Sequence, residues 1–191
     1  NPATGELADI DLPDVAAIEL GNQSGSEVAL LCGGGQLARG VRVLDLKTGN
    51  LRDVRLALTD LPPTGYLPEA QPMTFTGADG REVHAVVYPP RNPECTGPVT
   101  EAPPYVAWVH GGPTAHVLPR LSLMTAYFTS RGIGVIDVNY GGSTGFGRAY
   151  RDRLLGQWGI VDVEDTIAAI RGLADQGLAD PHRLAISGGS A

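Results

Sequence analysis

The order of strand-like segments in the second half of the chain is the feature that most constrains its fold. Residues 105–109 form an almost continuous apolar run, which is typical of a strand buried on both faces. Residues 133–138 and 184–186 are further short apolar runs, and each follows a helix-like segment. This βαβαβ order predicts a parallel sheet with right-handed connections.

Two amphipathic helices are expected between these strands. The first is predicted to open at Pro119 and to place one apolar face on the sheet, formed by Leu121, Met124, Tyr127 and Phe128. Gly132 would follow its end. In the second helix, apolar residues recur three and four positions apart up to a stop near Gly177; they are Ile160, Val163, Ile167, Ile170 and Leu173.

A hairpin is predicted just before this region. Residues 73–76 and 83–88 are strand-like and flank Asp79-Gly80, a dipeptide that favours a tight hairpin turn. A proline-rich surface loop follows over 89–104. Counted along the chain, the run at 105–109 is then the third strand and the run at 184–186 is the fifth.

The first part of the chain has a different pattern, in which short strand-like runs alternate with glycine and asparagine turns. Residues 28–32, 41–46 and 51–58 are expected strands, and Ala3-Thr4-Gly5 near the start repeats the turn at Lys47-Thr48-Gly49. The spacing of the repeat lies in the range of propeller blades, about 40–45 residues. Three prolines within 61–68 mark a boundary. We therefore predict a propeller end over 1–66 and a second domain over 67–191.

Composition and charge exclude several classes of function. The net charge is −7 and no basic cluster is present, which argues against a nucleic-acid partner. No apolar run approaches the length of a membrane helix. Cys32 and Cys95 are far apart without a metal-ligand spacing, so we expect two free thiols, no metal and no cofactor. We expect a cytoplasmic protein, and the oligomeric state is left open.

The last strand leads into a glycine-rich turn that contains a serine. Gly188-Gly189-Ser190-Ala191 fills four positions of the G-x-S-x-G pattern, in which a strained strand-to-helix turn exposes a nucleophilic serine. A simple βα turn with a serine in it would look the same. His110-Gly111-Gly112-Pro113 follows the third strand, where the α/β-hydrolase fold places an oxyanion-hole loop. This second motif favours Ser190 as the nucleophile.

A third glycine-rich segment, 139–147, follows the fourth strand. It lacks the lysine of a phosphate-binding loop, and we interpret it as a wall beside the active site. Together, residues 109–114, 137–148, 156–165 and 188–191 resemble the prolyl oligopeptidase family of serine peptidases, in particular its acylaminoacyl-peptidase and dipeptidyl-aminopeptidase-like branch. One departure is Gly141, where many relatives carry an arginine.

The resemblance implies an α/β-hydrolase fold preceded by the last strands of a β-propeller, and a peptide substrate. It implies Ser190 as the nucleophile and the backbone N–H groups of Gly112 and Ala191 as the oxyanion hole. In that family the triad acid and base follow the serine along the chain. We therefore expect this polypeptide to be part of a longer parent chain, to need the remainder of the catalytic domain, and to be inactive alone.

None of the four histidines is expected to replace the missing base. His182 lies at the start of the strand that precedes Ser190, His110 would shape the oxyanion loop, and His84 and His116 are expected at the surface. Trp158 and Asp165 are expected to pack and cap a helix. Two alternatives stay open: a carboxylesterase-type hydrolase, because the motifs do not separate esters from amides, and a non-catalytic binding module on the same scaffold.

Overall fold

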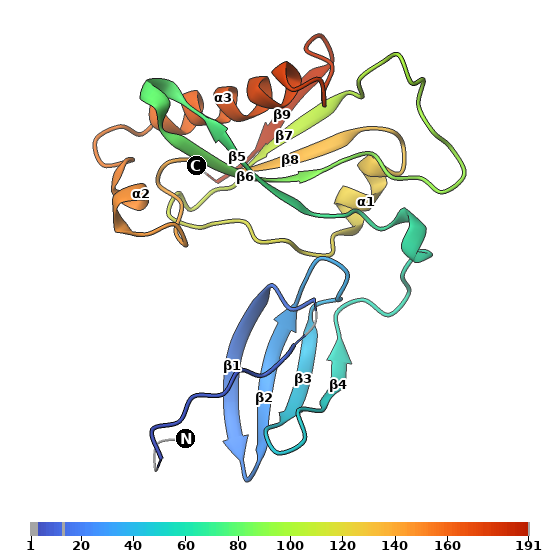
Figure 1. The fold of residues 1–191 in the computed structure, drawn as a ribbon, viewed down its shortest axis with the longest axis vertical. Coiled ribbons are helices and arrows are strands. Elements are labelled where there is room, and N and C mark those ends of the chain that lie inside the picture. Colours follow the sequence, from blue (N-terminus) through green and yellow to red (C-terminus); the bar gives the residue numbers. More distant parts are fainter. Residues whose placement is uncertain (1–3, 13, 191) are drawn as a thin grey trace.

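The computed structural model describes residues 4–12 and 14–190, which form two separate β-sheets (Figure 1). The first sheet has the order β1-β2-β3-β4 and the second has the order β5-β6-β8-β7-β9. The strands of the first sheet are β1 (Ala17–Ser24), β2 (Glu27–Gly33), β3 (Gly40–Asp45) and β4 (Leu51–Leu56). Those of the second are β5 (Gln71–Thr76), β6 (Glu82–Tyr88), β7 (Tyr105–Val109), β8 (Gly134–Asn139) and β9 (Leu184–Gly188).

The first sheet is an antiparallel meander, in which each strand pairs with its neighbour along the chain. Its core is small and consists of Leu30, Cys32 and Leu44. Arg42 is also buried, and its guanidinium donates to Asp53 and to the backbone carbonyls of Cys32 and Ala38. These bonds satisfy a charge that would be costly to bury alone.

Three of the four strands were predicted from the sequence, but β1 was not. The expected repeat at the start of the chain is wrong where the structure describes it, because residues 5–12 form no strand. A strand needs a partner for its backbone groups, and no described strand pairs with residues 5–12. The strand that pairs with β2 at the outer side of the sheet is β1.

The second sheet combines an antiparallel and a parallel part. β5, β6 and β8 pair antiparallel, whereas β7 pairs parallel with both β8 and β9. The predicted parallel βαβαβ unit is therefore confirmed, with β8 inserted between β6 and β7. Asp79 and Gly80 both have positive φ, 56° and 75°, as the predicted hairpin turn requires. The carboxyl ends of β7 and β9 lie side by side, since Val109 pairs with Gly188.

Helices cover both faces of this sheet (Figure 1). α3 (Val161–Asp175) packs over the face that carries Val83, Ala107 and Ile136, and α1 (Leu123–Thr129) covers the opposite face. α2 (Arg148–Asp152) and two short 3₁₀ turns, Thr64–Tyr66 and Ala78–Gly80, complete the described elements. Burial on both faces explains the continuous apolar runs of β7 and β8.

The predicted start of the first helix is wrong. α1 begins at Leu123, and Ser122 caps it by accepting a hydrogen bond from the N–H of Thr125 at 3.2 Å. The preceding segment lies outside the helix, and the N–H of its Leu121 donates to the carbonyl oxygen of Gly34, the residue after β2, at 2.6 Å. The buried side chains of α1 are Thr125, Ala126 and Thr129, while the predicted Met124 and Tyr127 are exposed.

The inner face of the second helix also differs from the prediction. α3 buries Val161, Asp165, Thr166, Ala169 and Leu173. Ile160, Val163 and Ile167 of the predicted face are exposed, whereas Leu173 lies in the core and Ile170 packs against it. Small and polar residues on the inner face let the helix approach the sheet closely and form hydrogen bonds there. Apolar periodicity alone gives no weight to such residues.

Candidate active site

Ser190 follows directly after β9 in a strained backbone conformation. Its φ is +64°, in the left-handed region that residues other than glycine seldom adopt. The side chain is exposed at the carboxyl edge of the sheet. A serine held in this way at the end of the fifth strand is the geometry that the G-x-S-x-G pattern predicts. Gly188 is needed here because a Cβ at its position would lie 2.8 Å from the carbonyl oxygen of Val109.

The loop after β7 lies against this turn. A Cβ at Gly111 would lie 2.5 Å from the carbonyl oxygens of both Gly189 and Ser190, so no other residue fits. Gly112 has a φ of +98°, and its N–H donates to the carbonyl oxygen of Ser190 at 3.1 Å. The structure thus brings Gly112 and Ser190 together. Ala191, the other expected oxyanion donor, lies outside the described residues.

His110 is fixed by contacts on three sides. Its Nε2 lies 2.8 Å from Oγ of Ser143, its Nδ1 lies 2.9 Å from the carbonyl oxygen of Gly111, and its ring stacks on Tyr140 at 4.5 Å. Burial lowers the pKa of His110 below its ordinary value, which favours the neutral ring. Because both ring nitrogens have partners, His110 is unsuited to act as a base toward Ser190 in this arrangement.

The other histidines do not contact the serine. His116 and His182 are exposed, and His116 is hydrogen-bonded to Thr144. His84 was expected at the surface but is half-buried, because its ring stacks on Phe146 at 4.3 Å. Within residues 4–12 and 14–190, no histidine is hydrogen-bonded to Ser190.

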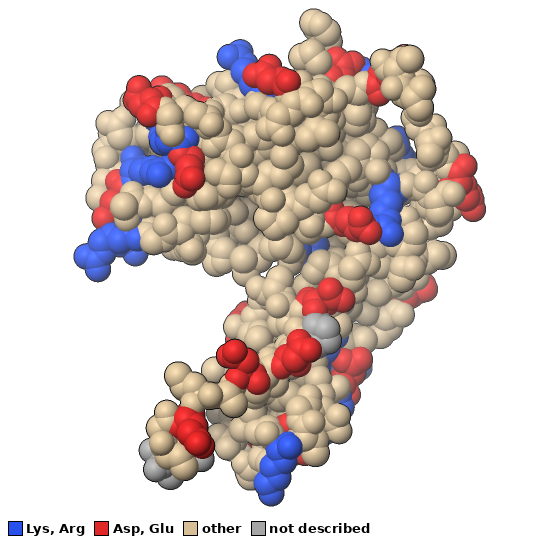
Figure 2. Space-filling model, viewed as in Figure 1, with Lys and Arg blue, Asp and Glu red and all other residues tan. Residues whose placement is uncertain are grey.

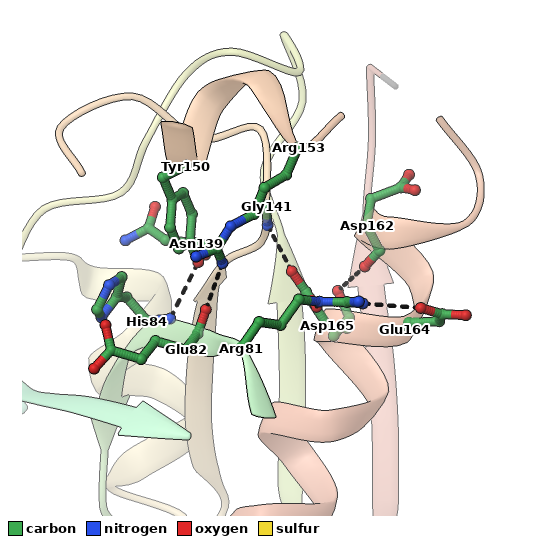
Figure 3. Close-up of polar contacts among 11 residues, drawn as sticks. Arg81, Glu82, His84, Asn139, Gly141, Tyr150, Arg153, Asp162, Glu164 and Asp165 are labelled. Atoms are coloured by element: carbon green, nitrogen blue, oxygen red, sulfur yellow. Dashed lines mark hydrogen bonds and ion pairs between the residues drawn. The ribbon is translucent and has the colours of Figure 1, made fainter. Parts of the chain in front are cut away.

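The loop after β8 is held by two buried polar residues that sequence reasoning did not assign to the site. Asn139 bonds both backbone groups of Val117, at 2.8 and 3.0 Å, and so fixes the segment that follows the Gly112 loop. Asp165 accepts the N–H of Gly141 at 2.8 Å and Nε of Arg81 at 2.7 Å (Figure 3). Two sequence signals could have identified these residues: Asp165 is a polar residue on the inner face of a helix, and Asn139 is an asparagine at the end of a strand.

Gly141, where the family pattern often has arginine, has no room for a side chain in this structure. A Cβ there would lie 2.7 Å from Cγ1 of Val161 and 3.0 Å from Oδ2 of Asp165. Tyr150 closes the loop from the other end, donating from its hydroxyl to the carbonyl oxygen of Asn139 at 2.6 Å (Figure 3). The loop therefore reaches His110 through Tyr140 and Ser143, in agreement with its interpretation as a wall of the site.

A buried carboxyl group lies on β8, which is separated by β7 alone from the strand that precedes Ser190. Asp137 on β8 borders a cavity together with Trp108, Arg120 and Ser187. Burial raises the pKa of Asp137 to about 6, and the positive charge of Arg120 partly opposes that rise.

Over the face drawn in Figure 2, Lys and Arg are scattered among Asp and Glu and do not gather into a patch. No helix within the described residues is long and apolar enough to cross a membrane.

In the second sheet the serine turn follows β9, the fifth strand along the chain, and the paired glycines follow β7, the third. This order defines an α/β-hydrolase fold, here preceded by the last strands of a β-propeller. Residues 119–191 match the Prolyl oligopeptidase family. The chain belongs to this family of serine peptidases.

Relatives of known structure cover the whole chain. A puromycin-hydrolyzing peptidase from Mycobacterium tuberculosis is 51% identical, with a TM-score of 0.95, over 100% of this chain and 30% of that one. A puromycin hydrolase variant complexed with PGG is 50% identical, with a TM-score of 0.90, over 98% of this chain and 28% of that one. The mouse acylamino-acid-releasing enzyme is 28% identical over 93% of this chain and 28% of its own length. The chain thus spans less than a third of each relative.

Proposed function

We propose that this chain is the part of a serine peptidase that carries the nucleophile, Ser190, and the two backbone N–H groups of the oxyanion hole, those of Gly112 and Ala191. The observation that carries the proposal is the contact between the strained Ser190 and Gly112, whose N–H donates to the serine backbone at 3.1 Å. A backbone N–H beside a nucleophile is the group that stabilises the oxyanion of an acyl-transfer reaction.

The proposed reaction passes through an acyl-enzyme. Oγ of Ser190 attacks the substrate carbonyl carbon, its proton passes to a base, and the carbonyl oxygen becomes an oxyanion bound by the N–H groups of Gly112 and Ala191. Collapse of this intermediate breaks the C–N bond, the amine leaves with a proton, and water later hydrolyses the ester on Ser190. When the residues after Ser190 form a helix, the Ser190 carbonyl joins the helical hydrogen bonds, and the Gly112 N–H becomes free for the substrate.

The proposed substrates are small peptides or aminoacyl compounds. This assignment rests on the names of the similar proteins, which are described as hydrolysing puromycin, releasing acylamino acids or, in one structure, complexed with PGG. The aromatic ring of Tyr140, stacked on His110, is compatible with an uncharged peptide group beside Ser190.

We further propose that the isolated 191-residue polypeptide has no appreciable turnover, that the remainder of the catalytic domain must be present, and that the protein works in the cytoplasm. The reason for inactivity is chemical, because a serine hydroxyl without a base is a weak nucleophile. No histidine within the described residues is hydrogen-bonded to Ser190 to serve as that base.

The test is labelling of the full parent protein with a fluorophosphonate, with Ser190→Ala as the matched control. We expect modification of the parent at Ser190 and none in the variant, and no turnover of an aminoacyl-nitroanilide by the 191-residue chain. Absence of labelling in the folded parent would show a binding module instead. Labelling with hydrolysis of simple esters but not of nitroanilides would show an esterase.

A further inference from the structure

The contacts of His110 determine which of its nitrogens carries the proton. A backbone carbonyl can only accept a hydrogen bond, so the 2.9 Å contact with the oxygen of Gly111 requires a proton on Nδ1. In a neutral ring Nε2 is then an acceptor, and the hydroxyl of Ser143, 2.8 Å away, must donate to it. The two contacts together define one tautomer and one hydroxyl orientation.

The same bond fixes the direction of the oxyanion donor. The carbonyl of Gly111 and the N–H of Gly112 belong to one peptide group, and in a planar trans peptide they point in opposite directions. When Nδ1–H of His110 holds the Gly111 oxygen, the Gly112 N–H must point away from His110. In the structure it points at Ser190.

The surroundings of His110 and Ser143 hold the two side chains rigidly. Ser143 is fully buried, and its N–H donates to the carbonyl of Tyr140 at 3.0 Å. The Tyr140 hydroxyl in turn donates to the carbonyl of His110 at 2.9 Å, while the rings of the two residues stack. The imidazole therefore has little freedom to rotate away from Gly111.

We propose that His110 and Ser143 form a positioning pair, in which the hydroxyl of Ser143 and the Nδ1–H of the neutral imidazole orient the Gly111–Gly112 peptide so that its N–H faces the reacting carbonyl. This inference rests on the proposed function, since it identifies the residues that orient the proposed oxyanion donor, the N–H of Gly112. Neither residue of the pair contacts the substrate in this role, so both are positioning residues.

Protonation of His110 should disrupt the pair. An imidazolium would donate from Nε2 to Oγ of Ser143, and the buried hydroxyl would have to turn its own proton elsewhere. The titratable groups that face His110 are Tyr140, stacked on its ring, and His116, whose electrostatic interaction lowers the pKa of His110. Asp137 and Arg120 border the same cavity as His110.

The first test is spectroscopic and needs no activity. In the ¹⁵N-histidine-labelled parent, we expect the Nδ1 of His110 to carry hydrogen and the Nε2 to resonate as a hydrogen-bonded acceptor. Ser143→Ala should shift the Nε2 resonance toward that of an unbonded nitrogen. A ring protonated on Nε2 in the wild-type protein overturns the proposal, even if the Ser143 variant does not fold.

The second test is kinetic, in the parent with an aminoacyl-nitroanilide. Loss of one oxyanion donor costs about 100-fold or more in kcat. A donor that is present but less well oriented should cost less, so we expect Ser143→Ala to lower kcat about tenfold and to change KM less than about twofold. Ser143→Thr, which keeps a hydroxyl, should restore most of the rate. The matched control is Thr129→Ala, which removes a buried hydroxyl that lies on α1, away from the site, and donates to the carbonyl of Thr125; it should leave kcat unchanged.

The outcomes separate the two proposals. A parent that fluorophosphonate does not label refutes the proposed function, whatever the tautomer of His110. A labelled, active parent in which folded Ser143→Ala retains the wild-type kcat refutes the positioning pair and leaves the peptidase assignment intact. An equal loss of kcat in Thr129→Ala also refutes it, because the effect would then follow from the loss of any buried hydroxyl.

Discussion

Asp165 on α3 accepts the backbone N–H of Gly141 at 2.8 Å and is entirely buried. Its other oxygen accepts a hydrogen bond from Nε of Arg81 at 2.7 Å. One carboxylate therefore joins α3, the loop after β8 and the turn between β5 and β6 (Figure 3). This loop carries Tyr140 and Ser143, which contact His110. The stability of the candidate site is therefore tied to a helix residue outside it.

Replacement of this carboxylate should destabilise the fold. Asp165→Ala leaves the buried N–H of Gly141 and the Nε of Arg81 without their acceptor, and we expect a loss of about 3 kcal/mol in the free energy of unfolding, measured by urea titration. Glu164→Ala is the matched control, since Glu164 pairs with the same Arg81 but its side chain is 49% exposed. It should cost less than about 1 kcal/mol. Equal losses would contradict the central role of Asp165.

Gly111→Ala should damage both stability and the site. The added methyl would meet two backbone carbonyl oxygens at 2.5 Å, and backbone atoms cannot move aside cheaply. We expect a loss of about 1–3 kcal/mol in the free energy of unfolding, and slower labelling of Ser190 by a fluorophosphonate in the parent protein. Gly97→Ala serves as the control, because nothing lies within 4 Å of its Cβ position. Normal labelling of a stable Gly111→Ala variant would argue against the close approach of the two loops.

The left-handed conformation of Ser190 should cost stability. In the parent, Ser190→Gly removes the side-chain strain at a φ of +64° and should raise the free energy of unfolding by about 1 kcal/mol relative to Ser190→Ala. Both variants lack the nucleophile, so both should be inactive, and the comparison isolates the backbone effect. The measurement is chemical denaturation of the two variants. No difference between them would show that the serine backbone is unstrained.

Burial of Asp137 should make stability fall as the pH rises. Its pKa is about 6 in the folded protein against 3.8 in the unfolded chain, so the folded state binds the extra proton between these values. Unfolding free energy should therefore decrease between about pH 4 and pH 6 by up to about 3 kcal/mol. Asp137→Asn should remove this slope and raise stability at pH 7.

Asp180 provides the opposite case. The backbone N–H of His182 and the side chain of Arg183 lower its pKa, so its contribution is present above the ordinary carboxyl pKa and is lost as the pH falls. Asp180→Asn should thus reduce stability at neutral pH more than at low pH. If Asp137→Asn and Asp180→Asn changed the pH profile in the same direction, the burial of Asp137 would be in doubt.

Local sequence patterns predicted the elements of the sheet well. Tyr105–Val109 was predicted with its observed limits, and the Asp79-Gly80 turn has the positive φ values that its residues favour. The inner faces of the helices were predicted less well. Apolar periodicity pointed to Met124 and Ile167, which are exposed, because it overlooks small and polar residues that permit close packing.

The sequence by itself determined the order of strands and helices, the turn before Ser190 and the glycines that must approach it, because these depend on neighbouring residues and on the absence of a Cβ. Only the tertiary structure decided which side chains support the turn. The contacts of His110 with Ser143, and of Asp165 with Gly141, join residues 33 and 24 positions apart. They exist because β8 is inserted between β6 and β7, a long-range pairing that no local pattern specifies.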